Sequence, residues 1–174
     1  MSASHRRLKA LGISTALAAA SLVIPTISAT AAHAGGCNDF SRLTSWNITT
    51  SRWGYIGYVE MDYSSACKQI SGHLHLDSAF YSGGHSGWNV TVTTDNESAS
   101  GTAEVTYTGS NNSDSQDFWT PIASIYGHPS ETFVAAADWE YDGCKLGAST
   151  GSWDFNNGRV LTAGSQFTWS GYSC

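Results

Sequence analysis

Two histidines and an aspartate occupy alternate positions between His73 and Asp77. Side chains two residues apart on a β-strand share a face and start about 6 to 7 Å apart, close enough to hold one metal ion. His73, His75 and Asp77 are therefore candidate metal ligands, and His85 or His128 could add another. The polar, solvent-facing side of an ordinary strand would explain the same pattern.

Pairs of carboxylates also alternate at two other places in the chain. Glu60 and Asp62 form one pair, and Asp138 and Glu140 form the other. Glycoside hydrolysis needs two carboxyl groups about 5 to 9 Å apart, one to protonate the leaving group and one to act as a base or nucleophile. These four residues are candidate catalytic groups, although a solvated strand face would again account for them.

The first carboxylate pair and the histidines lie on the two flanks of a predicted hairpin at residues 55–77. In each flank apolar and polar residues alternate, which is typical of strands with one buried face. Val59 and Met61 would point to one side of the sheet, and Glu60 and Asp62 to the other. The hairpin is thus expected to present its polar side chains together on one face.

Two short resemblances fall within this hairpin. The run from Val59 to Cys67 resembles a segment of small secreted actinobacterial proteins that carry a domain of unknown function, with Met61 in place of a leucine and Ile70 in place of a tryptophan. That resemblance implies export and a disulfide at Cys67, and it implies no activity. Glu60-Met61-Asp62 is similar to the Glu-x-Asp core of jelly-roll laminarinase-type glycosidases, but serines replace that family's second glutamate.

Further alternating segments follow at a spacing of roughly 8 to 12 residues, with turn residues between them. Residues 38–53 read as a loop or short edge strand, and residues 109–116 as a loop. Eight or nine short strands without an amphipathic helix predict an all-β fold, either an antiparallel β-sandwich (jelly-roll or Ig-like) or a small barrel. The expected strands cover residues 55–63, 69–77, 88–93, 103–107, 118–126, 133–141, 159–163 and 166–172.

Residues 1–34 have the features of a secretory signal peptide. A basic start precedes an apolar, alanine-rich stretch, and Ala32-His33-Ala34 fits the small-x-small rule for cleavage after Ala34. We therefore expect a secreted, extracellular protein with one β domain at residues 35–174. The style of the segment is that of bacterial export.

The charge of the remaining 140 residues argues against two classes of partner. Five basic residues stand against fourteen acidic ones, which is a formal net charge of −9 with neutral histidines. Nucleic acids and anionic membrane surfaces both require a basic surface. No later stretch has the roughly 18 apolar residues of a membrane span. The sequence does not indicate an oligomeric state.

All four cysteines follow the cleavage position, at Cys37, Cys67, Cys144 and Cys174. An even number of cysteines in an exported chain predicts two disulfides, and three connectivities are possible. The equal 30-residue separations favour Cys37–Cys67 and Cys144–Cys174. A four-cysteine zinc site would be expected to contain a C-x-x-C pair, which this chain lacks.

Aromatic residues are abundant in a chain of low charge, which favours a non-enzymatic binding module. Exposed rings can stack on sugars, so we expect a polysaccharide or cell-wall ligand and no cofactor. The alternatives are a small secreted polysaccharide hydrolase that uses the strand carboxylates, and an extracellular inhibitor or toxin that recognises a protein through the 109–116 loop. The tryptophans beside glycine or polar residues are the candidate ligand-binding residues: Trp53, Trp88, Trp119 and Trp153.

Overall fold

The structure is a computed structural model that describes residues 37, 39–83, 85, 87–98, 105–110, 116–128 and 130–174. Within these ranges the chain forms twelve strands and one short helix, so the prediction of an all-β fold is confirmed. The predicted signal peptide and its cleavage position lie outside the described residues. No helix in the described part is both long and apolar enough to cross a membrane.

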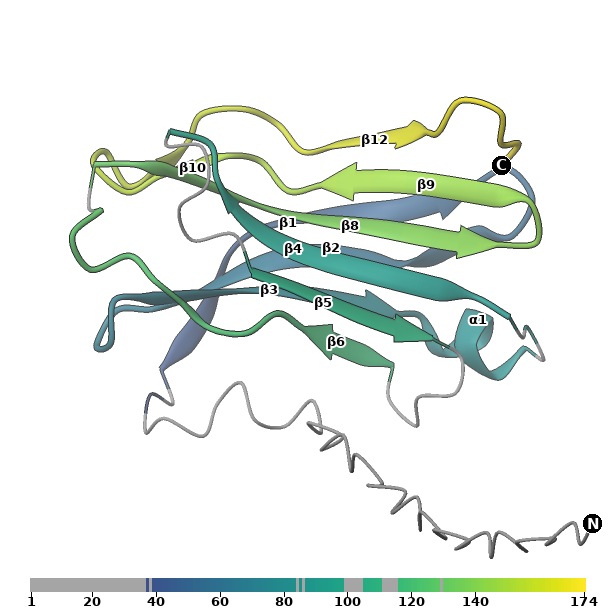
Figure 1. Cartoon of the computed structure of the whole chain (residues 1–174), viewed down its shortest axis with the longest axis horizontal. Coiled ribbons are helices and arrows are strands. Elements are labelled where there is room, and N and C mark those ends of the chain that lie inside the picture. Colours follow the sequence, from purple (N-terminus) through teal and green to yellow (C-terminus); the bar gives the residue numbers. More distant parts are fainter. Residues whose placement is uncertain are drawn as a thin grey trace, which may run out of the picture.

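The strands form two antiparallel sheets that pack face to face, and α1 (Ser78–Ser82) lies at one end of the sandwich (Figure 1). In the first sheet the order is β1-β2-β3-β6, with β7 also pairing with β3. These strands are β1 (Phe40–Thr50), β2 (Gly54–Ser64), β3 (Gln69–Leu76), β6 (Asp117–Trp119) and β7 (Ala123–Ser124).

In the second sheet the order is β11-β10-β8-β4-β5, and β9 joins β8 to β12. The strands are β4 (Asn89–Asn96), β5 (Val105–Ser110), β8 (Thr132–Tyr141), β9 (Cys144–Ser149), β10 (Trp153–Asp154), β11 (Arg159–Val160) and β12 (Ser165–Thr168).

One apolar core fills the space between the sheets. Val59 and Leu74 enter it from the first sheet, and Phe133 and Trp139 enter it from the second. These residues occupy alternate strand positions, as expected for strands with one buried face. The polar residues between them therefore point outward, which creates two polar outer faces.

The predicted hairpin is confirmed as β2 and β3, which pair from Gly57 with Leu76 to Ser64 with Gln69. The prediction of a loop or short edge strand at residues 38–53 is correct for an edge strand and wrong for its length, because β1 is an eleven-residue strand. It is an edge strand with two register shifts, and Ile48 is its one buried residue. A long polar strand of this kind shows little alternation of apolar and polar residues, so the sequence pattern does not reveal it.

A short helix interrupts the all-strand pattern directly after β3. Asp77 caps α1, since its side chain accepts a hydrogen bond from the backbone N–H of Ala79 at 2.9 Å. Phe80 is the buried residue of the helix. The predicted third member of the metal set therefore has a structural role at this turn.

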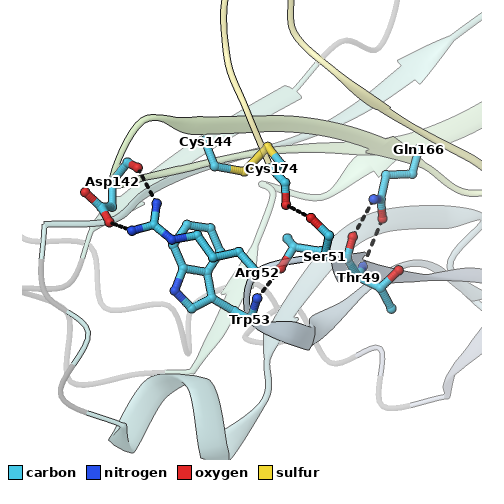
Figure 2. The surroundings of a disulfide bond; sticks show 9 residues. Thr49, Ser51, Arg52, Trp53, Asp142, Cys144, Gln166 and Cys174 are labelled. Atoms are coloured by element: carbon cyan, nitrogen blue, oxygen red, sulfur yellow. Dashed lines mark hydrogen bonds and ion pairs between the residues drawn. A yellow bond between two sulfur atoms is a disulfide. The ribbon is translucent and has the colours of Figure 1, made fainter.

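The two disulfides join Cys37 to Cys67 and Cys144 to Cys174, which confirms the favoured pairing. Their Cα–Cα distances of 6.0 and 4.8 Å are ordinary for disulfides. The second bridge fixes the C-terminal residue to the start of β9. Figure 2 shows this bridge beside the turn that links β1 to β2.

Polar contacts attach the C-terminal segment to the first sheet (Figure 2). The Gln166 side chain exchanges two hydrogen bonds with the backbone of Thr49, at 2.9 and 2.6 Å. The Ser51 hydroxyl donates to the carbonyl of Cys174 at 2.6 Å. Strand β12 is thus held between β9, with which it pairs, and the end of β1.

Candidate functional site

Small side chains occupy the middle of the outer face of the second sheet, across β4, β8 and β9. Two cross-strand rows can be followed from the register. Thr91, Asp138 and Gly147 form one row, and Ala136 pairs in the next with Thr93 and Ser149. Small side chains at these positions leave room for a ligand that lies along the face.

Two aromatic side chains stand at the edge of this face. Phe167 and Trp169 are 51% and 41% exposed, and their ring centroids are 5.3 Å apart in an edge-to-face arrangement. Phe167 pairs across from Gly147, and its ring fills the space that a side chain at 147 would need. The absence of a side chain at Gly147 therefore lets the ring lie close against the sheet.

Polar contacts hold Trp169 in place. Its indole N–H donates to Asp138 Oδ1 at 2.9 Å, and Lys145 Nζ lies 5.3 Å from the ring centroid. Lys145 Nζ also lies 3.8 Å from Glu140 Oε2, and the two groups form an ion pair. The ring is thus oriented by a carboxylate and a cation that both belong to the outer face.

Together these residues line a shallow groove, which we call the aromatic groove. Its volume is about 220 Å³, and an adjoining recess adds about 70 Å³. The groove is lined by Thr91, Thr93, Ala136, Ala137, Asp138, Gly147, Ala148, Ser149, Phe167 and Trp169. The recess shares Thr91 and Asp138 with it and adds Asn89, Val90, Glu140 and Lys145.

The four tryptophans expected to bind a ligand lie elsewhere. Trp88 is 1% exposed and belongs to the core, which corrects the expectation that it is exposed. Trp53 and Trp153 are half-buried and pack against the core. Trp119 stacks on a histidine of the first sheet. Among the residues whose exposure the structure describes, the exposed aromatic ones are instead Trp46, Tyr55, Tyr126, Phe167, Trp169 and Tyr172.

The outer face of the first sheet carries a different set of groups, which we call the histidine–carboxylate cluster: Glu60, Asp62, His73, His75 and Asp117. His73 pairs across from Glu60 in β2, and His75 pairs across from Asp117 in β6. The histidines therefore lie on one strand face, as predicted. The aspartate beside them is Asp117, since Asp77 caps α1.

His73 is the centre of this cluster and is almost fully buried. Its Nδ1 lies 2.7 Å from Glu60 Oε1, and its Nε2 lies 2.8 Å from Asp117 Oδ1. The ring stacks on Trp119 with 3.8 Å between centroids and an interplanar angle of 2°. These contacts determine both the plane of the imidazole and the direction of each nitrogen.

The carboxylates of the cluster differ in their proton affinity. Burial, followed by the nearby charge of Glu60, raises the pKa of Asp62 to about 6. For Asp117, burial raises the pKa, but hydrogen bonds from His75 and His73 outweigh it, and the net shift is downward. Glu60 forms an ion pair with Arg42. Asp62, whose carboxyl group has a raised pKa, thus lies beside Glu60, whose carboxylate is paired with Arg42.

The remaining predicted residues do not join the cluster. Asp138 and Glu140 lie on the opposite sheet, so the four candidate catalytic carboxylates belong to two separate places. His85 stacks on Phe80, and His128 pairs with Glu131. The predicted 109–116 loop starts too early, because residues 109 and 110 belong to β5, and residues 111–115 lie outside the described residues.

Comparison with known proteins gives no match to a family model, to a curated protein or to a solved structure. The fold and its surfaces define the class instead: a two-disulfide β-sandwich domain with an aromatic groove on one outer face and a histidine–carboxylate cluster on the other.

Proposed function

We propose that this protein is a non-catalytic carbohydrate-binding domain that acts outside the cell and binds a polysaccharide in the aromatic groove. The observation that carries the proposal is the pair of exposed rings, Phe167 and Trp169, along the edge of the groove on this outer face. Two disulfides favour an oxidising, extracellular location.

The chemistry of the groove suits a sugar chain. A pyranose ring has an apolar C–H face that packs on an aromatic ring, while its hydroxyl groups need hydrogen-bond partners. Phe167 and Trp169 would supply the apolar contact. Asp138 and the threonines Thr91 and Thr93 lie beside the rings and would meet the hydroxyls.

The shape of the groove favours a polymer over a small sugar. It is shallow, and it adjoins the recess that contains Asn89, Glu140 and Lys145. Small-molecule sites enclose most of their ligand, whereas an open face leaves both ends of a chain free to continue. An insoluble polysaccharide presents such chains.

The two carboxylates of this face, Asp138 and Glu140, contact side chains that line the groove and its recess. Asp138 accepts from the Trp169 indole, and Glu140 faces Lys145. Both therefore orient the groups that line the groove. This arrangement supports a binding role for the two residues on β8.

The experiment is a pull-down on insoluble cellulose, chitin and peptidoglycan, with protein expressed from residues 1–174 in an exporting bacterial host. We expect one of these polymers to deplete the wild-type protein from solution. Trp169→Ala and Phe167→Ala should each weaken binding at least about tenfold, as loss of a central aromatic contact does. Tyr126→Ala is the matched control, because Tyr126 is 84% exposed and does not line the groove.

Binding of the wild type that both groove variants retain in full would refute the groove as the site. Failure of all three polymers to bind would instead direct attention to a protein partner. Tryptophan fluorescence should change on binding in the wild type and change less in Trp169→Ala.

One observation favours the hydrolase as a second candidate. Glu60 and Asp62 lie close together beside His73, and the pKa of Asp62 is raised to about 6, as in a general acid. Release of reducing sugar that is lost in Glu60→Gln, with groove binding retained, would establish that activity.

A further inference from the structure

Three potential metal ligands converge on the outer face of the first sheet. They belong to His73 and His75 of β3 and Asp117 of β6, and each of these residues offers one ligand atom within 4.8 Å of those of the other two. Asp117 Oδ1 is 2.8 Å from His73 Nε2 and 2.8 Å from His75 Nδ1. Both imidazoles thus turn a nitrogen toward the same carboxylate oxygen.

The contacts of His73 match those of a metal-binding histidine. Such a residue usually donates its second ring N–H to a carboxylate, which fixes the ring and makes the other nitrogen a better ligand. His73 Nδ1 lies 2.7 Å from Glu60 Oε1, and the second oxygen of Glu60 is paired with Arg42. The supporting shell of the site is therefore present within the chain.

The contacts of Asp117 show how a cation would fit at this point. Asp117 Oδ1 lies within hydrogen-bonding distance of both His73 Nε2 and His75 Nδ1. In the tautomer of His73 that donates from Nδ1 to Glu60, the lone pair of Nε2 is available to a metal ion. His75 Nδ1 and Asp117 Oδ1 would reach the same ion, which would replace the hydrogen bonds between them.

The spacing of the ligands and their access to solvent suit a small divalent ion. Tetrahedral ligands about 2.0 to 2.1 Å from an ion lie about 3.3 Å from one another, so each 2.8 Å contact needs to open by only about half an ångström. The side chains of His75 and Asp117 are 26% and 45% exposed, which provides an entry path. Two imidazoles and one carboxylate favour Zn²⁺ over Ca²⁺ or Mg²⁺.

We propose that His73, His75 and Asp117 bind one zinc-class divalent ion, with Glu60 orienting His73 and a solvent molecule completing the coordination. This metal centre lies on the sheet opposite the aromatic groove and is independent of it. With three protein ligands it leaves one position of a tetrahedral zinc site to solvent.

The test uses Zn²⁺ and Co²⁺ with the EDTA-treated protein. Isothermal titration calorimetry should show one equivalent of Zn²⁺ bound with a dissociation constant of about 1 μM or tighter. Co²⁺ should give visible absorption bands of a four-coordinate site, and Zn²⁺ should displace it. His75→Ala and Asp117→Asn should each weaken Zn²⁺ binding more than about tenfold, and Glu60→Gln by about tenfold.

The matched control is His128→Ala, which removes an imidazole outside the cluster and should leave Zn²⁺ binding unchanged. Asp117→Asn preserves the shape of the side chain, so it keeps the test valid if His75→Ala does not fold. The proposal is overturned if the folded wild type binds no Zn²⁺ at about 100 μM metal, a concentration far above the expected dissociation constant. It is equally overturned if Asp117→Asn and His75→Ala bind Zn²⁺ as the wild type does.

Discussion

The ring of Phe167 lies directly over Gly147 of the neighbouring strand, in the space that any side chain at 147 would fill. Gly147 pairs in turn with Asp138, which accepts the indole N–H of Trp169. The two exposed rings of the aromatic groove are thus positioned by β8 and β9, although both follow in the C-terminal segment of the chain.

Gly147→Ala should displace the Phe167 ring and weaken polysaccharide binding about as much as Phe167→Ala does. Because the ring is half exposed, it can swing into solvent, and we expect a loss of stability of about 1 kcal/mol. Urea unfolding and the pull-down measure the two effects. If the change acts through the ring, Gly147→Ala should have little further effect on binding in a Phe167→Ala background. Additive losses would contradict this coupling.

Replacement of Cys144 and Cys174 by serine should lower both stability and polysaccharide affinity. The bridge closes a loop with a separation of 30 residues, and its loss should cost about 3 to 4 kcal/mol. It also releases the C-terminal residue, whose carbonyl accepts from Ser51, and with it the anchor of the segment that carries Phe167 and Trp169.

The second disulfide provides the matched control for this experiment. Cys37 and Cys67 enclose an equal separation of 30 residues, so their replacement by serine should reduce stability by a similar amount. Cys67 lies in the turn of the β2–β3 hairpin, away from the groove, and binding should be retained while the protein stays folded. Equal losses of affinity in both variants would indicate a general unfolding effect.

Regular alternation predicts the strands that have one strongly apolar face. Residues 55–77 and 133–141 are of this kind, and the structure confirms them as β2, β3 and β8. β1 and β9 lack this regular alternation of apolar and polar residues. β1 is a polar edge strand with two register shifts, and β9 contains the small residues from Gly147 to Ser149. Pairing with β2 and β8 makes them strands, and alternation within one segment does not report such pairing.

The residues of the two candidate sites divide in the same way, into those that the sequence pattern predicts and those that it does not. The shared face of His73 and His75 is predictable from a period of two, whereas Asp117 lies more than 40 residues further along and in a three-residue strand. Phe167 and Trp169 are also two residues apart on an expected strand, so the sequence pattern predicts that they share a face. Polar neighbours in the sequence do not report exposure, because Trp88 has them and is buried.

Asp39→Asn should make the protein less stable at neutral pH. Hydrogen bonds, first from the Ser64 hydroxyl and then from the backbone N–H of Ala66, lower the pKa of Asp39 from 3.8 to about 2. The ionised form is therefore favoured by folding, and the stability that it contributes is present above about pH 4 and is lost as the pH falls toward 2. Chemical unfolding at pH 7 and pH 3 should show a larger difference between variant and wild type at pH 7.

Asp62→Asn should have the opposite effect. Burial, and then the charge of Glu60, raises the pKa of Asp62 from 3.8 to about 6, so the folded protein holds this proton more tightly than the unfolded chain does. The wild type should lose stability as the pH rises from about 4 through 6, whereas a neutral asparagine has no such loss. In EDTA at pH 8 the variant should be about 1 to 2 kcal/mol more stable than the wild type, and near pH 4 the two should agree. Urea unfolding between about pH 4 and pH 8 measures the difference in stability between the variant and the wild type. A variant that is less stable than the wild type at pH 8 would show that folding favours the charged form of Asp62.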